Sequence, residues 1–186
     1  MLRHIVIAVC TLALAACGFH LRGQTTLPFD TLYVPINTTL AVELKRNIAA
    51  STQTKLVSTP EAAEARLQIQ GETREKVILS LDSSGRVAEY QLRAGVAFRV
   101  VDSRGLEYLP LNRIQLTRDV SFNDAEVLAK ESEETLLYRD MQTDMVQQML
   151  RRLGAAHTPD ASATPVPAPG PSMTVSPPPA APGPGL

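Results

Sequence analysis

The chain has 186 residues and a net charge of −1, with 18 Lys and Arg against 19 Asp and Glu. A length of this order suits one domain, and a hydrophobic fraction of 44% suits a packed core. The balanced charge lacks the basic footprint of a nucleic-acid-binding protein, so no nucleic-acid partner is expected. Ten of the 14 Pro residues follow His157. The composition thus excludes a wholly disordered or polytopic membrane chain and predicts a leader, one domain and a Pro-rich tail.

Residues 1–16 have the organisation of a secretory signal peptide. A short positive start is followed by an apolar run over residues 5–16, which falls short of the roughly 20 residues that a membrane-spanning helix needs. The run ends in Leu-Ala-Ala-Cys at positions 14–17, which resembles the bacterial lipobox. In that motif the leader is cleaved before the Cys, whose thiol receives a diacylglyceryl group and whose new amine is acylated.

Cys17 is therefore the predicted lipid-attachment residue, and we expect no metal and no cofactor other than these covalent acyl groups. Two or more acyl chains hold a protein stably on a membrane. Gly18 follows the Cys, and the absence of Asp there favours export to the cell outer membrane in lipoproteins that resemble this one. Because Cys10 leaves with the leader, the mature chain has neither disulfide nor free thiol, and its fold must rest on its core.

The predicted domain, residues 17–156, begins with a strand and a helix. Alternating apolar residues over 32–36 predict a short half-buried strand, and Pro35 indicates a sheet edge or a strand end. A Thr at position 38 or 39 is placed to cap a helix whose apolar residues recur every four positions over 40–48. The segment 55–57 weakly indicates a further strand.

Residues 65–122 carry the strongest strand pattern of the chain. Apolar residues alternate within three segments, which Asp-Ser-x-Gly tetrapeptides at 82–85 and 102–105 separate. This tetrapeptide suits a tight turn in which the Gly takes a positive φ. The pattern predicts an antiparallel three-stranded meander in which Gly71 marks a bulge. A strand over 65–81 would span about 55 Å, so either bulges bend it or its end projects past the helices.

A long helical segment follows, starting at Asn123 or Asp124 and running to about Leu153. Its stripe of Leu137, Met141, Met145 and Met149 is interpreted as core filling rather than as a lipid-binding surface. The polar stretch 130–134 is a candidate break in this helix. Residues 157–186 are rich in Pro, Ala, Gly and Ser and predict a disordered tail, which serves either as a tether or as a spacer.

No catalytic set of residues is recognisable. The mature chain has only two His residues and no Gly-rich phosphate loop, Gly-x-Ser-x-Gly or His-Glu-x-x-His motif, so we expect neither an enzyme nor a metal site. Binding is the remaining class of function. Basic residues beside an apolar β-surface suit a phosphorylated glycolipid, because they pair with phosphates while the apolar surface meets acyl chains. The candidate residues are Arg86, Arg104, Arg118 and Lys130, of which Arg118 shares the parity of the core-facing positions.

Three segments of the sequence are similar to segments of a known family. They are Cys-Gly-Phe-His-Leu-Arg-Gly at 17–23, Ala-Glu-Tyr-Gln-Leu at 88–92 and the segment 141–153. In this order they resemble the mature start, the central strand and the last helix of the LptE family of lipopolysaccharide-assembly lipoproteins. The likeness covers about residues 17–155 and leaves the tail outside.

The resemblance implies an α+β sandwich in which two helices pack on one face of a roughly four-stranded, mostly antiparallel sheet. It also implies an LptD-type outer-membrane barrel as partner, which the lipoprotein plugs and helps to assemble, and binding of lipopolysaccharide for delivery to the outer leaflet. Lys130 matches a basic position of the family that binds lipopolysaccharide. The other such position falls at Ser83, so its charge is displaced to Arg86 or lost.

Two other classes of function are open at this stage. The Pro-rich tail suits a scaffold or accessory lipoprotein of another envelope machine, since such tails reach across gaps. A periplasmic enzyme with an unfamiliar site would draw on Glu72, Arg74 and Glu75, which alternate faces along one strand.

Overall fold

The structure is a computed structural model that describes residues 25–159. The predicted leader, the lipid-attachment residue Cys17, the family-like start at 17–23 and the predicted tail beyond Pro159 lie outside the described residues. The elements in chain order are β1 (Thr31–Tyr33), α2 (Thr39–Ser51), β2 (Lys55–Val57), the 3-10 turn η1 (Pro60–Ala62), β3 (Ala65–Leu81), β4 (Val87–Asp102), β5 (Glu107–Ser121), the 3-10 turn η2 (Asp124–Glu126) and α3 (Val127–Gly154).

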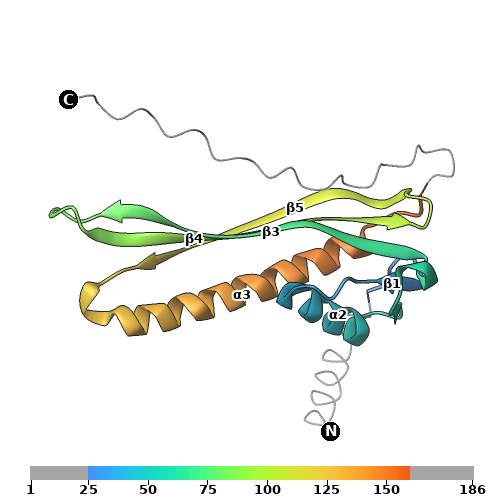
Figure 1. Ribbon diagram of the computed structural model, residues 1–186, viewed down its shortest axis with the longest axis horizontal. Coiled ribbons are helices and arrows are strands. Elements are labelled where there is room, and N and C mark those ends of the chain that lie inside the picture. The colour runs from blue at the N-terminus through green and yellow to red at the C-terminus, as the bar shows by residue number, and fades with distance from the viewer. Residues whose placement is uncertain (1–24, 160–186) are drawn as a thin grey trace, which may run out of the picture.

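The strands form one mixed sheet in the order β2-β1-β3-β4-β5. β1 runs parallel to both β2 and β3, whereas β3, β4 and β5 form the predicted antiparallel meander. Both helices lie on the same face of this sheet (Figure 1). The α+β class is therefore confirmed. The expectation of about four strands is wrong by one, because the weakly indicated segment 55–57 pairs with β1 over its whole length.

The two predicted turns and the predicted bulge are present. Gly85 and Gly105 have φ values of 81° and 88°, which a residue with a Cβ rarely adopts. The pairing of β3 with β4 shifts register between Ile69 and Gly71. A one-residue shift exchanges the two faces of a strand. As a result Glu72, which accepts a hydrogen bond from the Thr38 hydroxyl at 2.6 Å, lies on the helix-covered face beyond the bulge.

The helix α2 begins where the sequence predicts. The Thr38 hydroxyl accepts a hydrogen bond from the Ala41 amide at 3.2 Å, which caps the first turn. The apolar side of α2 is fully buried against the sheet and α3. It packs into a core that also contains Phe98 and Leu92 from β4 and the Met stripe of α3. The interpretation of that stripe as core filling is thus confirmed, since Met141 and Met149 have no exposed surface.

The helix α3 is continuous over its 28 residues, so the candidate break at 130–134 is wrong. Glu residues in this stretch are good helix formers. The ammonium of Lys130 also lies 2.9 Å from the Glu133 carboxylate one turn later, which adds local support. A helix of this length measures about 42 Å, so α3 runs along nearly the whole sheet. Among the described residues, neither helix is long and apolar enough to cross a bilayer.

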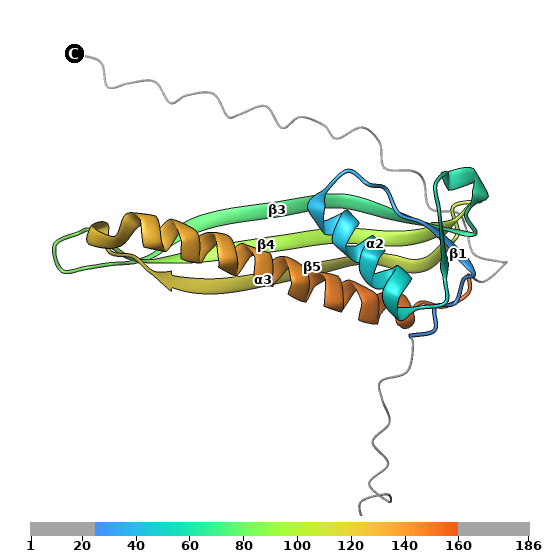
Figure 2. The same ribbon diagram turned by 90° about the horizontal axis from the view of Figure 1, so that it is seen from below.

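The domain is elongated and its two ends differ (Figure 2). At one end, here called the packed end, β1, β2, α2 and the β4–β5 turn surround the last turns of α3. At the other, here called the hairpin end, residues 76–90 of the β3–β4 hairpin lie beside residues 120–134, and α3 is the one long helix there. The first described residue, Thr25, donates its amide to the Ser51 carbonyl and so lies at the packed end.

Candidate functional site

The hairpin end exposes large apolar side chains. The fractional exposures of Ile78, Leu79 and Leu81 on β3 are 59%, 45% and 57%, and those of Val127 and Leu128 at the start of α3 are 39% and 80%. The two groups come from segments far apart in the sequence. Both lie at the hairpin end because β4 pairs with β5 and the Phe122 amide, just before α3, donates to the Ala88 carbonyl at 2.8 Å. Several exposed large apolar side chains at one end of a domain are typical of a binding site.

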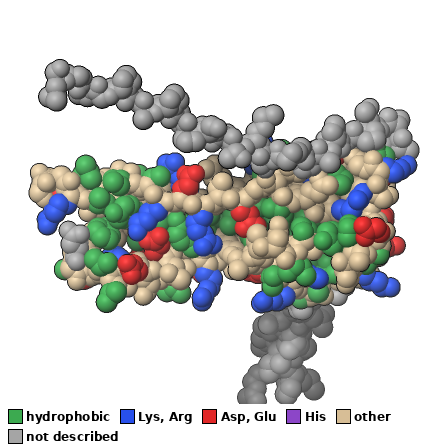
Figure 3. Space-filling view, viewed as in Figure 1, with side chains coloured by type: hydrophobic (Ala, Val, Ile, Leu, Met, Phe, Trp, Pro, Cys, Tyr) green, Lys and Arg blue, Asp and Glu red, His purple; other side chains and the backbone are tan. Residues whose placement is uncertain are grey.

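Basic side chains stand among these apolar residues. The ammonium of Lys76 lies 2.6 Å from the Glu134 carboxylate of α3 and 4.3 Å from the centroid of the Tyr90 ring. The ammonium of Lys130 donates to the Ser121 hydroxyl at 3.0 Å and to Glu133 at 2.9 Å. In a space-filling view, basic, acidic and hydrophobic side chains intermingle toward this end, at the left (Figure 3).

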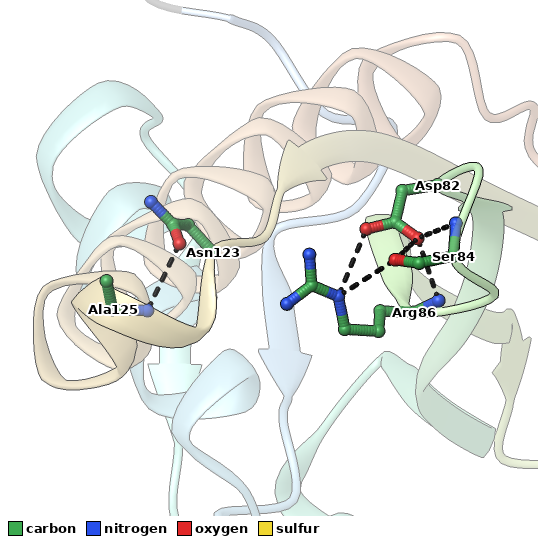
Figure 4. A network of polar contacts seen from close by, with 5 residues as sticks. All are labelled: Asp82, Ser84, Arg86, Asn123 and Ala125. Atoms are coloured by element: carbon green, nitrogen blue, oxygen red, sulfur yellow. Dashed lines mark hydrogen bonds and ion pairs between the residues drawn. The ribbon is translucent and has the colours of Figure 1, made fainter.

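The hairpin turn itself is organised around one carboxylate (Figure 4). Oδ1 of Asp82 accepts hydrogen bonds from the Ser84 hydroxyl at 2.6 Å, from the Ser84 amide at 2.8 Å and from the Arg86 amide at 3.0 Å. Oδ2 lies 3.2 Å from Nε of Arg86. The hydroxyl of Ser84 and the amide of Arg86 are the chief causes that lower the pKa of Asp82 to about 2. Because these donors favour the ionised form, the Asp82 carboxylate stays charged at an acidity that protonates an ordinary Asp.

The Nε atom of Arg86 is bound within the turn, whereas most of its side chain is exposed. Its side chain is 69% exposed, although Nε donates to both Asp82 and Ser84. Asp82, Arg86 and Phe122 border a small hollow of about 90 Å³ together with Asn123, whose side chain accepts from the Ala125 amide. Arg86 thus lies at the hairpin end, beside the segment that leads from β5 into α3.

The four predicted basic residues are brought together only in part. Arg86 and Lys130 both lie at the hairpin end. Arg104 lies in the β4–β5 turn at the packed end, where its Nε contacts Asp102 at 3.0 Å. Arg118 lies between the ends and points toward α3, as its parity predicts, with Nη2 donating to the Asp144 carboxylate at 2.7 Å. Lys130 and Arg86 are therefore the two that share one end of the domain.

Two cationic residues of β3 were missed as candidates for binding. Lys76 is part of the hairpin end, and the guanidinium of Arg74 lies 4.7 Å from the centroid of the Tyr138 ring on α3. Gly71 is the sequence feature that could have revealed both residues, because a bulge there turns positions 74 and 76 toward the face that the helices cover. The alternative hypothesis, in which Arg74, Glu72 and Glu75 form an enzyme site, finds little support in the structure. Glu72 is bonded to Thr38, and Glu75 contributes its backbone carbonyl to the Tyr138 hydroxyl.

The described part of the chain contains no group of three or more His, Cys, Asp or Glu side chains arranged to hold a metal ion. What the hairpin end offers chemically is a mixed surface of exposed aliphatic side chains, ammonium and guanidinium groups, and carboxylates. Such a surface suits recognition of an amphiphile with anionic groups, since cations pair with phosphates and apolar side chains meet acyl chains.

Comparison with known proteins assigns the family. A family model described as LptE, lipopolysaccharide-assembly, matches residues 29–153. A Photorhabdus laumondii protein named LPS-assembly lipoprotein LptE is 26% identical over 161 residues, covering 84% of the chain and 87% of the relative. A Pectobacterium atrosepticum protein of the same name is 28% identical over 161 residues, covering 80% of the chain and 83% of the relative.

Solved structures agree in fold. One is the solution structure of an uncharacterized lipoprotein B from Nitrosomonas europaea, which is 47% identical in sequence and superposes with a TM-score of 0.65. The match covers 74% of the chain described here and 91% of the Nitrosomonas europaea chain. The rare lipoprotein B of Shewanella oneidensis is 24% identical and shows the same fold, with a TM-score of 0.58. That match covers 67% of the chain described here and 94% of the Shewanella oneidensis chain. The matched family is one of envelope lipoproteins with an assembly role and not one of enzymes. The chain therefore belongs to the LptE family and acts in lipopolysaccharide assembly.

Proposed function

We propose that this protein is a lipoprotein of the cell outer membrane that plugs and helps to assemble an LptD-type β-barrel, and that its hairpin end binds lipopolysaccharide during delivery to the outer leaflet. In this proposal Cys17 carries the diacylglyceryl and N-acyl groups. The sequence supports the anchor through the lipobox at 14–17, and the family membership supports the role in assembly.

The proposal rests on one observation: exposed aliphatic side chains and basic side chains occur together at the hairpin end. Leu81 and Leu128 are each more than half exposed, at 57% and 80%. Lys130 and Arg86 stand beside them on the same end of the domain. Exposing this much apolar surface is unfavourable in water, at about 25 cal/mol per Å², unless a ligand or partner covers it.

The ion pair of Lys130 is exposed on one side only. The Lys130 side chain is 19% exposed and that of its partner Glu133 is 47% exposed, so the carboxylate can turn into water while the ammonium keeps its place. A phosphate group forms a stronger charge-assisted hydrogen bond with the same ammonium once water is excluded. Lys76, whose side chain is 35% exposed, lies between Glu134 and the Tyr90 ring, so a phosphate group can reach its ammonium as well as that of Lys130.

The elongated shape supports the plug. A barrel lumen accepts a long, narrow domain, and both α3 and the meander run along the long axis of this one (Figures 1 and 2). A domain in that position presents one end to each side of the barrel. The hairpin end is then the part that meets a ligand passing through, while the packed end, where Thr25 begins, lies nearest to the anchor.

The test is a pull-down from outer membranes solubilised in mild detergent, with a tag after Leu186. Mass spectrometry measures the barrel that is recovered, and a lipid A assay measures bound lipopolysaccharide. We expect a stoichiometric large β-barrel. In the double variant Leu128→Asp/Lys130→Gln the lipopolysaccharide signal should fall at least fivefold, because the surface loses both an apolar contact and a cation.

The matched control is Arg104→Gln, which removes one cation at the packed end and should retain the lipopolysaccharide signal. Circular dichroism of each variant checks that the domain is folded. Recovery of the folded lipoprotein without any β-barrel would overturn the plug. Equal lipopolysaccharide in the wild type and the double variant would overturn the assignment of the site to the hairpin end.

A further inference from the structure

The helix-free face of the sheet contains a hollow that the proposed function does not use. It lies near the middle of β3, β4 and β5 and has a volume of about 440 Å³. Arg113 and Gln115 in its lining flank the core-facing Ile114, so the hollow is on the side opposite to both helices, which cover the other face (Figure 1). Its floor and rim include Gly71, Gly95 and Ala97, which leave space where other residues would place side chains. Leu111 on β5 borders it and is 42% exposed.

The hollow depends on one glycine in the central strand. A Cβ on Gly95 would lie 2.9 Å from the Thr73 hydroxyl and 3.2 Å from the Ile114 carbonyl, which is closer than side chains normally approach. The close packing of β3 and β5 against Gly95 therefore requires a residue without a side chain at this position. The depression is a consequence of how the three strands pack, and its shape does not rely on a flexible surface loop.

The described chain beyond α3 ends beside β5, the edge strand that borders the hollow. After Gly154 the backbone crosses to the sheet, and the His157 amide donates to the Tyr108 carbonyl at 3.0 Å, near the beginning of β5. The described residues stop two positions later, at Pro159, and 27 residues follow. From Tyr108 to Gln115, which lines the far side of the hollow, β5 covers about 24 Å. Eight residues of extended, Pro-rich chain cover about 25 Å.

The charge of the segment after His157 is complementary to the charge in the lining of the hollow. Asp160 is the only charged residue after His157. Arg113 lines the hollow, and its guanidinium has no hydrogen-bond or ion-pair partner among residues 25–159. Arg113 is five positions along β5 from Tyr108, about 17 Å, and Asp160 is three positions from His157, about 10 Å, so the two side chains can meet.

We propose that residues 160–167 fold back along β5 and cover the hollow, with Asp160 paired to Arg113. The segment reads Asp-Ala-Ser-Ala-Thr-Pro-Val-Pro, whose small apolar side chains match a shallow depression. Its Pro residues restrict the unbound chain, so ordering it on the sheet costs less conformational entropy than ordering a Gly-rich segment would. The tail thus shields the face of the meander that no helix covers.

Photocrosslinking of the purified, full lipoprotein in detergent tests this contact. A photoactivatable residue in place of Ala163 should crosslink mainly to peptides of β4 and β5 that border the hollow. Arg113→Asp should reduce those crosslinks at least fivefold, and the double variant Arg113→Asp/Asp160→Arg should restore them. Arg46→Asp, which changes an exposed cation on α2, is the matched control and should leave the crosslinks unchanged.

Three outcomes would overturn the proposal. The crosslinks could spread over the domain in proportion to exposure, they could persist undiminished in Arg113→Asp, or the charge exchange could fail to restore them. Because the protein is studied without a barrel or lipopolysaccharide, failure here leaves the proposed function untouched. The thermal unfolding midpoint of each variant confirms that a lost crosslink does not report an unfolded domain.

Discussion

The two Asp-Ser-x-Gly turns have the same local structure and lie in opposite surroundings. In each, the first Asp accepts hydrogen bonds from the amides two and four residues later, and the Gly has a positive φ. Asp82 lies at the exposed hairpin end. Asp102 lies at the packed end, where it is 8% exposed and next to Leu106, which is 3% exposed. The same turn chemistry therefore occurs at an exposed surface at one end and beside the core at the other.

The difference lies in the packing around the turns. At the packed end β1, β2, α2 and α3 all contribute to the core, and Phe98 and Val100 of β4 have no exposed surface. Toward the hairpin end α2 is absent, and residues 70–76 of β3 are exposed throughout. The hairpin end is thus stabilised mainly by strand pairing and by α3, which leaves its side chains available for contacts with other molecules.

The largest contrast should come from removing one apolar side chain at each end. Phe98→Ala should lower the free energy of unfolding by about 4 kcal/mol, because it opens a cavity in the core. Leu128→Ala should change it by less than about 0.5 kcal/mol, since that side chain is exposed. Urea denaturation of the two variants measures both values. Similar losses would show that the two ends are packed alike.

The two turn carboxylates offer a smaller and more specific contrast. Asp102→Ala should cost about 2 kcal/mol, because it leaves the Arg104 and Leu106 amides at the packed end without their acceptor. Asp82→Ala should cost clearly less, since water can replace the lost acceptor at an exposed turn. The measurement is again the unfolding free energy. An equal cost at both turns would contradict the role assigned to burial.

The smallest expected effect concerns pH at the hairpin turn. The pKa of Asp82 is lowered from 3.8 to about 2, so the charged form stabilises the fold. That contribution is fully present above about pH 4 and is lost as the pH falls through 2. An NMR titration of the side-chain carboxyl carbon should give a midpoint near 2, and Ser84→Ala should raise it, because the Ser84 hydroxyl is the largest cause of the shift. A wild-type midpoint near 3.8 would contradict this.

Much of the fold follows from local patterns in the sequence. The cap at Thr38, the two glycine turns, the meander and the buried Met stripe are each determined by interactions within a few residues or by simple alternation. The fifth strand was only weakly indicated, because three residues carry little signal until a neighbouring strand pairs with them. The continuity of α3 through 130–134 was missed, because a polar stretch signals exposure as readily as it signals a break.

The candidate site was predictable only in part. Lys130 and Arg86 were found from their positions beside a turn and a helix start. Arg104 lies within the second Asp-Ser-x-Gly turn and Arg86 directly follows the first, and only the meander topology sends the two turns to opposite ends of the sheet. Lys76 was missed, because the face that it occupies depends on the bulge at Gly71.

By itself the sequence determined the elements, their turns, the lipobox-like motif at 14–17 and the family likeness, because each depends on short-range chemistry. The tertiary structure decided which of those elements meet. It placed Leu128 beside the hairpin, separated Arg104 from Arg86, and opened a hollow at Gly95, since these outcomes depend on strand register and on the side of the sheet that each helix covers. Local propensity carries no information on either.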